Sequence, residues 1–106
     1  MEKAYGISWS AKADRDLKCL ECQTSYPDEH TTQKRKDEII LAVRKLAQFP
    51  EFGRVLRFLG PSWRQIVCPP HRIIYYVHHD LQTVFISRIW HASRAEPTED
   101  DLIPLR

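Results

Sequence analysis

The feature that most constrains the fold is the stretch HRIIYYVHHDLQTVFISRIWHASR, residues 71–94, which is typical of a β-hairpin. Apolar β-forming residues fill Ile73–Val77 and Val84–Ile89, and the polar break at residues 79–82 predicts the reversal between them. Cationic side chains mark the outer ends of both strands: Arg72 on the first, and Arg88, His91 and Arg94 on the second. Such an end of a sheet suits phosphate binding or acid/base chemistry.

The rest of the chain predicts a strand, two helices and further antiparallel strands. Tyr5, Ile7 and Trp9 alternate with small or polar residues, as in a half-buried strand. Ser10 is a good N-cap for a first helix, which we expect from about Ala11 to about Thr24. A second helix is expected from about Asp28 or Glu29 to about Gln48, with an apolar stripe of Ile39, Val43 and Leu46, widened by Ile40 and Ala47.

After Pro50 and Gly53 the pattern changes to a period of two residues. It predicts short strands at Arg54–Leu59 and Trp63–Cys68, and the hairpin of residues 71–91 completes the sheet. Pro97 and Pro104 mark an irregular tail, in which residues 97–102 are compatible with one helical turn.

A chain of 106 residues is expected to form one domain, with its core in about residues 4–94 and an acidic tail at 95–106. The start lacks the apolar run of a signal peptide, and no segment has the length of a membrane span. We therefore expect a cytoplasmic protein without a membrane partner. Three cysteines fit reduced thiols in that compartment better than a disulfide framework.

Charge is distributed unevenly along the chain. Residues 1–53 hold nine Lys/Arg and nine Asp/Glu, residues 54–94 hold six arginines with Asp80 as their one acid, and residues 95–106 hold four acids and Arg106. An all-arginine segment suits planar contacts to phosphate or carboxylate, although arginines also solvate exposed sheet faces. The acidic tail is free either to fold back over the basic segment or to extend from it.

Several motifs together resemble the RelE/ParE superfamily of type II toxins. These are the opening Y-x-I-x-W-S with Ala13 and Asp16-Leu17, the helix end LAQFPEFGR, and HRIIYYV followed by VFISRIWHASR. Each is weak alone, but their order and spacing over about residues 4–94 make the resemblance fairly specific.

The resemblance implies an α+β fold: an N-terminal strand, a two-helix hairpin, and a three- to four-stranded twisted antiparallel sheet, in the order β-α-α-β-β-β. It also implies a growth inhibitor that a cognate antitoxin neutralises by wrapping a helix and an extended segment around it. ParE-like members inhibit DNA gyrase and are not known to use nuclease chemistry, so on this reading the protein is not an enzyme. RelE-like members enter the ribosome and cleave mRNA without a metal. An inert relative that only binds an antitoxin is a third possibility.

The sequence matches the nuclease branch only in part. Such cleavage needs a base, cations around the phosphate and an acid. Arg72 stands where the nucleases place a phosphate-binding arginine, and His91 lies near their basic or acid/base residue, so these two would be catalytic in a nuclease. Arg64 matches one basic position on the preceding strand. Ile66 and Ala92, however, occupy positions where the nucleases carry further functional side chains. These departures favour the ParE-like branch, in which Arg64, Arg72, Arg88 and Arg94 are candidates for binding the target or a phosphate.

Two alternatives concern Arg72 and His91. Arg72 is also suited to a structural ion pair with Asp14 or Asp16, and His91 to a hydrogen-bonded position at the rim. Whether they share a face depends on the hairpin register. We favour Val77 opposite Val84, which would set Arg72 against Ile89, on the side of His91.

The predicted antitoxin-binding surface combines the helix hairpin with basic residues of the sheet. An amphipathic helix of the antitoxin would fill a groove on the helices. The candidate contacts are Leu17, Leu20, Ile40, Arg57 and Arg64.

The cysteines and the tryptophans offer two further hypotheses, a zinc site and stacking on nucleobases, which the sequence does not favour. Cys19-x-x-Cys22 and Cys68-x-x-His71 supply the four ligands that a structural zinc requires, but Cys19 and Cys22 fall within a helix that must pack, so we expect no metal or other cofactor. The tryptophans are suited to stacking on nucleobases, yet their alternation with polar neighbours favours core or antitoxin-facing positions for Trp9 and at least one other.

Overall fold

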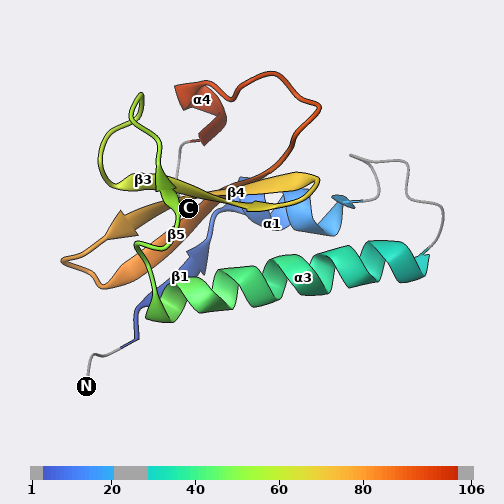
Figure 1. Cartoon of the computed structure of the whole chain (residues 1–106), viewed down its shortest axis with the longest axis horizontal. Coiled ribbons are helices and arrows are strands. Elements are labelled where there is room, and N and C mark those ends of the chain that lie inside the picture. The colour runs from blue at the N-terminus through green and yellow to red at the C-terminus, as the bar shows by residue number, and fades with distance from the viewer. Residues whose placement is uncertain (1–3, 21–28, 103–106) are drawn as a thin grey trace.

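The computed structural model describes residues 4–20 and 29–102 (Figure 1). The predicted order of elements, a strand, helices and then a run of strands, is confirmed. The elements are β1 (Gly6–Trp9), α1 (Ala11–Lys18), α3 (Glu29–Gln48), β2 (Arg54–Val55), β3 (Trp63–Cys68), β4 (His71–His78), β5 (Thr83–His91) and α4 (Glu99–Leu102).

The strands form one five-stranded sheet in the order β1-β5-β4-β3-β2. Strands β2, β3, β4 and β5 pair with one another antiparallel, as the α+β prediction required. The N-terminal strand joins the edge beside β5 and runs parallel to it, with Ile7 opposite Val84. The sheet is therefore mixed, and β1 connects the start of the chain to its most central hairpin.

Helices α1 and α3 pack on one face of the sheet, and α4 lies over the other (Figure 1). The predicted stripe of α3 is buried at Ile39, Val43 and Leu46, together with Ala13 and Leu20 and with the inward residues of β4 and β5. A second core lies on the opposite face and consists of Leu56, Trp63, Ile74, Trp90 and Leu102. Both faces of the central strands are thus covered.

Two elements end earlier in the structure than the sequence predicted. α1 ends at Lys18 and not near Thr24, and Cys19 is its C-cap; the remainder of the predicted segment, from residue 21, lies outside the described residues. The strand predicted at Arg54–Leu59 ends at Val55. Its last ladder bond runs from the Leu56 N–H to the Trp63 carbonyl, after which the chain turns, with the Leu59 N–H bonded to the Leu56 carbonyl.

Ser10 is the N-cap of α1, as predicted: its hydroxyl accepts the N–H of Ala13 (2.9 Å). The same hydroxyl donates to the carbonyl of Ser87 (2.7 Å), which fixes α1 to β5. None of the helices in the described part of the chain has the length and apolarity needed to cross a membrane.

The described part of the acidic tail folds back over the sheet. We call residues 95–102 the C-terminal strap. Leu102 is completely buried, its carbonyl accepts the Ser87 hydroxyl, and the Ala95 carbonyl accepts the indole N–H of Trp90 (3.0 Å). The predicted helical turn is confirmed as α4.

Candidate functional site

The hairpin register agrees with the prediction near the turn and departs from it at the outer end. Val77 pairs with Val84, but a β-bulge follows, because Tyr75 pairs with Ile86 whereas Ile74 pairs with Arg88. Ser87 is the extra residue of the bulge.

The bulge separates the two residues that the favoured register had brought together. Arg72 pairs with Trp90 and not with Ile89, whereas His91 pairs with His71. Because paired residues project to the same side of a sheet, Arg72 lies on the strap face and His91 on the helix face. The prediction that Arg72 and His91 share a face is therefore wrong.

His91 is held by the turn that follows it. The backbone N–H of Ser93 donates to Nδ1 of His91 (3.0 Å), and Oγ of Ser93 lies 2.6 Å from the same nitrogen. Nδ1 is thus an acceptor, so the neutral ring carries its proton on Nε2. This tautomer makes Nε2 a hydrogen-bond donor and leaves it without the lone pair that a general base requires.

His71 lies against His91, with ring centroids 5.2 Å apart in an edge-on arrangement. It is 1% exposed, and neither ring nitrogen has a hydrogen-bond partner among the described residues. Burial, together with the His91 and Arg35 charges, lowers the pKa of His71 to about 4. His71 is therefore a neutral core residue at physiological pH.

Arg72 is bound by its own chain. Its guanidinium donates to Oε1 of Gln65 (3.1 Å) and, through two nitrogens, lies 3.4 Å from Oε2 of Glu96 in the C-terminal strap. The Arg72 side chain is 18% exposed, whereas that of Glu96 is 75% exposed. An incoming anion would have to displace Glu96, which is the accessible partner of this pair.

Arg88 forms the buried ion pair with Asp16 that was one alternative for Arg72. Its Nε and NH2 donate to the two carboxylate oxygens of Asp16 (2.7 and 2.9 Å), and the Ile89 N–H donates to the same carboxylate (3.1 Å). The Arg88 side chain is 12% exposed and that of Asp16 is 9% exposed. Asp14 instead pairs with Lys18 on the surface. Arg88 thus connects β5 to α1.

The other predicted target-binding arginines also contact their own chain. Arg64 donates to the carbonyls of Glu51 (3.1 Å) and Gly53 (2.8 Å) and so holds the loop before β2. Arg94 is exposed, and its guanidinium carbon lies 3.8 Å from the centroid of the Trp90 ring. Of the four predicted target-binding arginines, Arg94 is the one that is exposed, whereas Arg64, Arg72 and Arg88 are partly buried.

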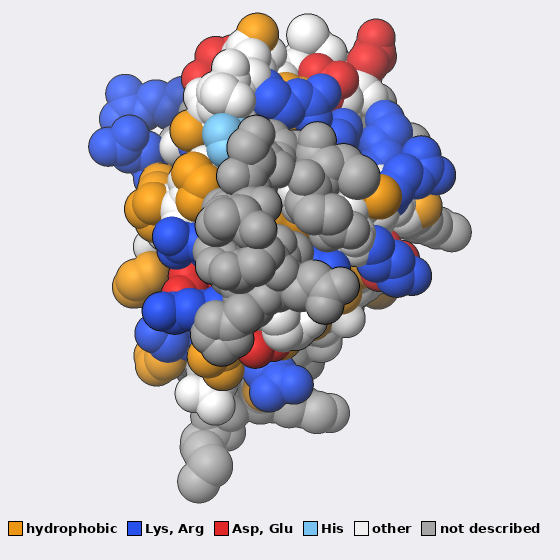
Figure 2. Space-filling view, turned by 90° about the vertical axis from the view of Figure 1, so that its right-hand side faces the viewer, with side chains coloured by type: hydrophobic (Ala, Val, Ile, Leu, Met, Phe, Trp, Pro, Cys, Tyr) orange, Lys and Arg blue, Asp and Glu red, His pale blue; other side chains and the backbone are white. Residues whose placement is uncertain are grey.

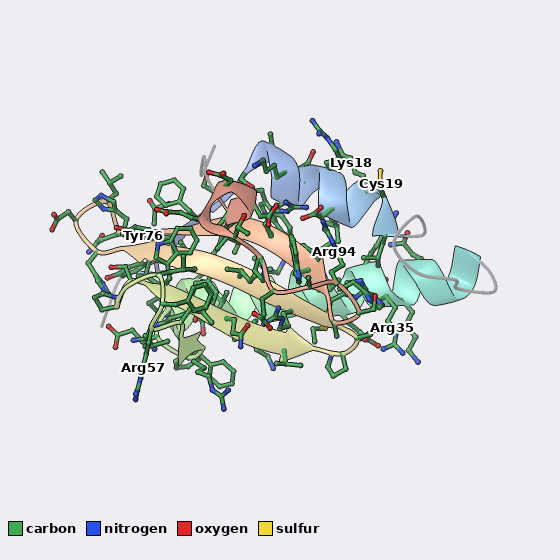
Figure 3. The ribbon with its side chains drawn as sticks, turned by 90° about the horizontal axis from the view of Figure 1, so that it is seen from above. Lys18, Cys19, Arg35, Arg57, Tyr76 and Arg94 are labelled. Carbon is green, nitrogen blue, oxygen red and sulfur yellow. The ribbon has the colours of Figure 1, made fainter. Side chains whose placement is uncertain are left out.

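The end of the molecule where α1 ends and α3 begins is rich in Lys and Arg side chains (Figure 2). Arg94, Arg35 and Lys18 lie at that end, whereas Arg57 and Tyr76 lie at the opposite end of the sheet (Figure 3). Arg57 is exposed, as an interface residue must be.

A groove between the helices and β1 lies where the antitoxin-binding surface was predicted. We call it the helix groove; its volume is about 440 Å³. It contains the predicted Leu17 and Ile40, and its other lining residues are Ile7, Trp9, Asp14, Val43 and Arg44. Leu20 is completely buried in the core and does not line the groove. Trp9 thus faces this groove, while Trp63 and Trp90 are buried in the second core.

The zinc alternative finds no ready site in the part of the chain that is described. Cys19 is exposed and Cys68 is half-buried, whereas Cys22 lies outside the described residues. Burial, together with the Glu38 charge, raises the pKa of the Cys68 thiol. No group of three metal-ligating side chains occurs among the described residues.

Sequence reasoning missed an exposed aromatic and basic segment. Phe49, Phe52 and Phe58 are between 61% and 72% exposed, and Arg54 is exposed among them. The segment PEFGRVLRF, residues 50–58, combines aromatic and basic residues, and this combination is the sequence signal for the surface.

Solved structures share this fold at low sequence identity. A ParDE toxin–antitoxin system from P. aeruginosa matches with a TM-score of 0.68 and 20% identity over 83% of this chain and 96% of that one. The RelBE2 toxin–antitoxin complex from Mycobacterium tuberculosis matches with a TM-score of 0.64 and 20% identity, over 83% of this chain and 98% of that one. A mutant of the E. coli toxin RelE in the free state matches with a TM-score of 0.63 and 15% identity, over 85% of each chain.

No curated protein sequence matches this chain. The model of one protein family does match, and its description is the ParE toxin of the type II toxin–antitoxin system parDE. The match covers residues 7–96, from β1 to the start of the C-terminal strap. The chain therefore belongs to the family of ParE toxins of type II toxin–antitoxin systems.

Proposed function

We propose that this toxin inhibits growth by acting on DNA gyrase and that a cognate antitoxin neutralises it. The observation that carries the choice of target is the separation of Arg72 and His91 onto opposite faces of the sheet. A nuclease needs its base and its phosphate-binding cation around one phosphate. Membership of the ParE family supports the same choice.

The chemistry of each residue also argues against RNA cleavage. The Ser93 N–H directs Nδ1 of His91 to accept, so Nε2 carries the ring proton and is not a base. Arg72 and Arg88 are engaged by Glu96 and Asp16. We infer that these two arginines stabilise the fold and take no part in bond-breaking chemistry.

Two in vitro assays with purified toxin test whether its target is DNA gyrase or the ribosome. The toxin is added to DNA gyrase with relaxed plasmid, and separately to translating ribosomes with labelled mRNA. We expect loss of supercoiling with the mRNA intact. Cleavage of mRNA in the ribosomal A site that disappears with Arg72→Ala or His91→Ala would favour the RelE-like function instead. Absence of both effects, and of growth arrest on expression, would identify an inert antitoxin-binding relative.

The helix groove supports the second part of the proposal, the antitoxin. Its lining includes the half-buried apolar residues Leu17, Ile40 and Trp9 and the exposed charged residues Asp14 and Arg44. An amphipathic helix fits such a groove, with its apolar side inward and its charges at the rim. Two of the similar structures are toxin–antitoxin systems, which is consistent with this use. Arg57 and Arg64 would contact acidic residues of the antitoxin outside the groove.

Two neighbouring residues of α3 provide a matched test of the helix groove. Ile40 lines it, whereas Leu41 points outward and is 57% exposed. We expect Ile40→Asp to weaken binding of the antitoxin encoded beside the toxin at least tenfold, measured by calorimetry, because a carboxylate would be buried among apolar groups. Leu41→Asp should change the affinity less than threefold. Equal effects of the two changes would place the antitoxin elsewhere.

A further inference from the structure

A small pocket opens on the strap face of the sheet, between the C-terminal strap and the loop that joins β2 to β3 (Figure 1). We call it the strap pocket; its volume is about 270 Å³. The lining residues are Phe58, Leu59, Trp63, Pro97, Thr98 and Glu99. Pockets that hold a whole cofactor or a drug-sized molecule are usually larger, about 300 to 1,000 Å³. The size of the strap pocket therefore suits a single small chemical group.

Hydrogen bonds within each wall of the strap pocket fix its shape. In the loop, the Trp63 N–H donates to the Gly60 carbonyl (3.2 Å), and Gly60 has a φ of 115°, a conformation that favours glycine. In the strap, the Asp101 carboxylate accepts the N–H (2.8 Å) and the hydroxyl (3.1 Å) of Thr98. Both walls are thus preorganised, so that binding of a small group would cost little ordering of the protein.

Aromatic side chains supply one part of the lining. Phe58 is 63% exposed, whereas Trp63 is 9% exposed and belongs to the second core. The Tyr76 ring packs against Trp63 with a centroid distance of 5.3 Å and an interplanar angle of 73°, which holds the indole in place. The face of an aromatic ring is electron-rich and attracts cations, and tryptophan does so most strongly. The pocket therefore offers aromatic surface that suits a cationic group.

The charge at the strap pocket is negative. Glu99 lines the pocket and is exposed, and no ion pair of its carboxylate occurs among the described residues. No basic side chain from the described part of the chain lines the pocket. Arg57 is the neighbour of Phe58 in the sequence, but its side chain points away from α4 (Figure 3). Glu99 is therefore available to a cation from outside the chain.

We propose that the strap pocket binds a guanidinium group, either of a small guanidine or of an arginine side chain on a partner protein. A guanidinium is flat and permanently charged, so it can stack on an aromatic ring and donate two parallel hydrogen bonds to a carboxylate. Phe58 and Trp63 would supply the rings, and Glu99 the carboxylate. An anion would instead be repelled by Glu99, and a neutral group would gain nothing from its charge.

Methylguanidinium and its neutral isostere methylurea provide the first test. Each is titrated into the isotope-labelled chain, and the indole N–H signal of Trp63 reports binding. We expect methylguanidinium to bind with at least about fivefold higher affinity than methylurea, because the cation alone interacts electrostatically with the rings and with Glu99. The indole signal of Trp9, which lines the helix groove, should not move.

Two substitutions with matched controls identify the groups that bind. Glu99→Gln removes the charge, and Phe58→Leu removes the ring but keeps an apolar side chain; each should weaken methylguanidinium binding roughly fivefold or more. Asp100→Asn makes the same charge change on the next residue, and Phe49→Leu the same ring change at another exposed position. Neither control residue lines the pocket, so the affinity should stay within about twofold. The amide spectrum verifies the fold of each variant.

A blocked tripeptide, acetyl-Gly-Arg-Gly-amide, distinguishes the two sources of the guanidinium. Tighter binding of the tripeptide than of methylguanidinium indicates an arginine presented by a protein, and weaker binding indicates a small guanidine. Equal binding of methylguanidinium and methylurea, or binding that Glu99→Gln and Phe58→Leu leave unchanged, would overturn the proposal. So would a shift of the Trp9 signal as large as that of Trp63. Because the strap pocket and the helix groove share no residue, these outcomes are independent of gyrase and of the antitoxin.

Discussion

Asp16 determines the role of Arg88. The carboxylate accepts three hydrogen bonds, two from the Arg88 guanidinium and one from the Ile89 backbone. Arg88 also donates to the Asp101 carbonyl (3.1 Å), and its guanidinium carbon lies 5.0 Å from the centroid of the Trp90 ring. One arginine thus joins α1, β5 and α4, and its charge is used inside the fold.

Replacing Asp16 tests this internal role. Asp16→Asn removes the negative charge and leaves the Arg88 guanidinium buried without a counter-charge, which we expect to cost about 3 to 5 kcal/mol of unfolding free energy. Asp14→Asn is the matched control on the same helix; its pair with Lys18 is exposed, so its loss should cost less than about 1 kcal/mol. Urea unfolding of both variants gives the comparison. Similar costs would mean that the Arg88 pair contributes no more than a surface pair.

At the scale of elements, the sequence predicted most of the architecture. Apolar residues spaced by three or four located the second helix, and apolar residues spaced by two located β3 and both strands of the hairpin. Burial of one face of a helix or strand imposes these spacings. The outer register of the hairpin was predicted wrongly. The core residues Val84, Ile86 and Ile89 are spaced by two and then by three residues, so the bulge at Ser87 interrupts the alternation, whereas a regular register was assumed.

The candidate site was predicted less well than the fold for a related reason. The sequence identified Arg72, Arg88 and His91 as chemically distinctive, and all three lie on the hairpin as expected. Their partners, however, come from distant elements: Asp16 from α1 and Glu96 from the strap. Such pairings depend on tertiary packing, which neither residue type nor spacing encodes. The exposed residues Phe52 and Arg54 were missed because exposure is also a tertiary property.

The C-terminal strap is an element whose contribution can be measured. Leu102 is completely buried in the second core, beside Trp90 and Ile74. We expect Leu102→Ala to cost about 2 to 5 kcal/mol, as for other large-to-small changes in a core. Leu81→Ala, at a position that is 61% exposed in the hairpin turn, should cost less than about 1 kcal/mol. If thermal and urea unfolding show equal costs, the strap does not stabilise the sheet.

At the scale of the whole molecule, the two cores share one central hairpin. β4 contributes Ile73 and Tyr75 to the helix-side core and Ile74 to the strap-side core. A change at the outer end of this hairpin therefore affects both layers. His71 occupies that end on the helix side, fully buried and against His91, so its protonation state influences the stability of the entire chain.

The pH dependence of folding follows from the lowered pKa of His71. Its pKa is about 4 in the folded protein and 6.5 in an unfolded reference, so between these values the unfolded chain binds a proton that the folded chain does not. Stability should thus be complete above pH 6.5 and fall as the pH is lowered toward 4, by on the order of 3 kcal/mol from this residue. His71→Leu removes the titrating group and should flatten this part of the profile. The difference between wild-type and variant unfolding free energies, measured by urea at pH 7.5, 6 and 5, isolates His71 from the other histidines. A difference that stays constant across these three pH values would show that His71 binds a proton equally in both states.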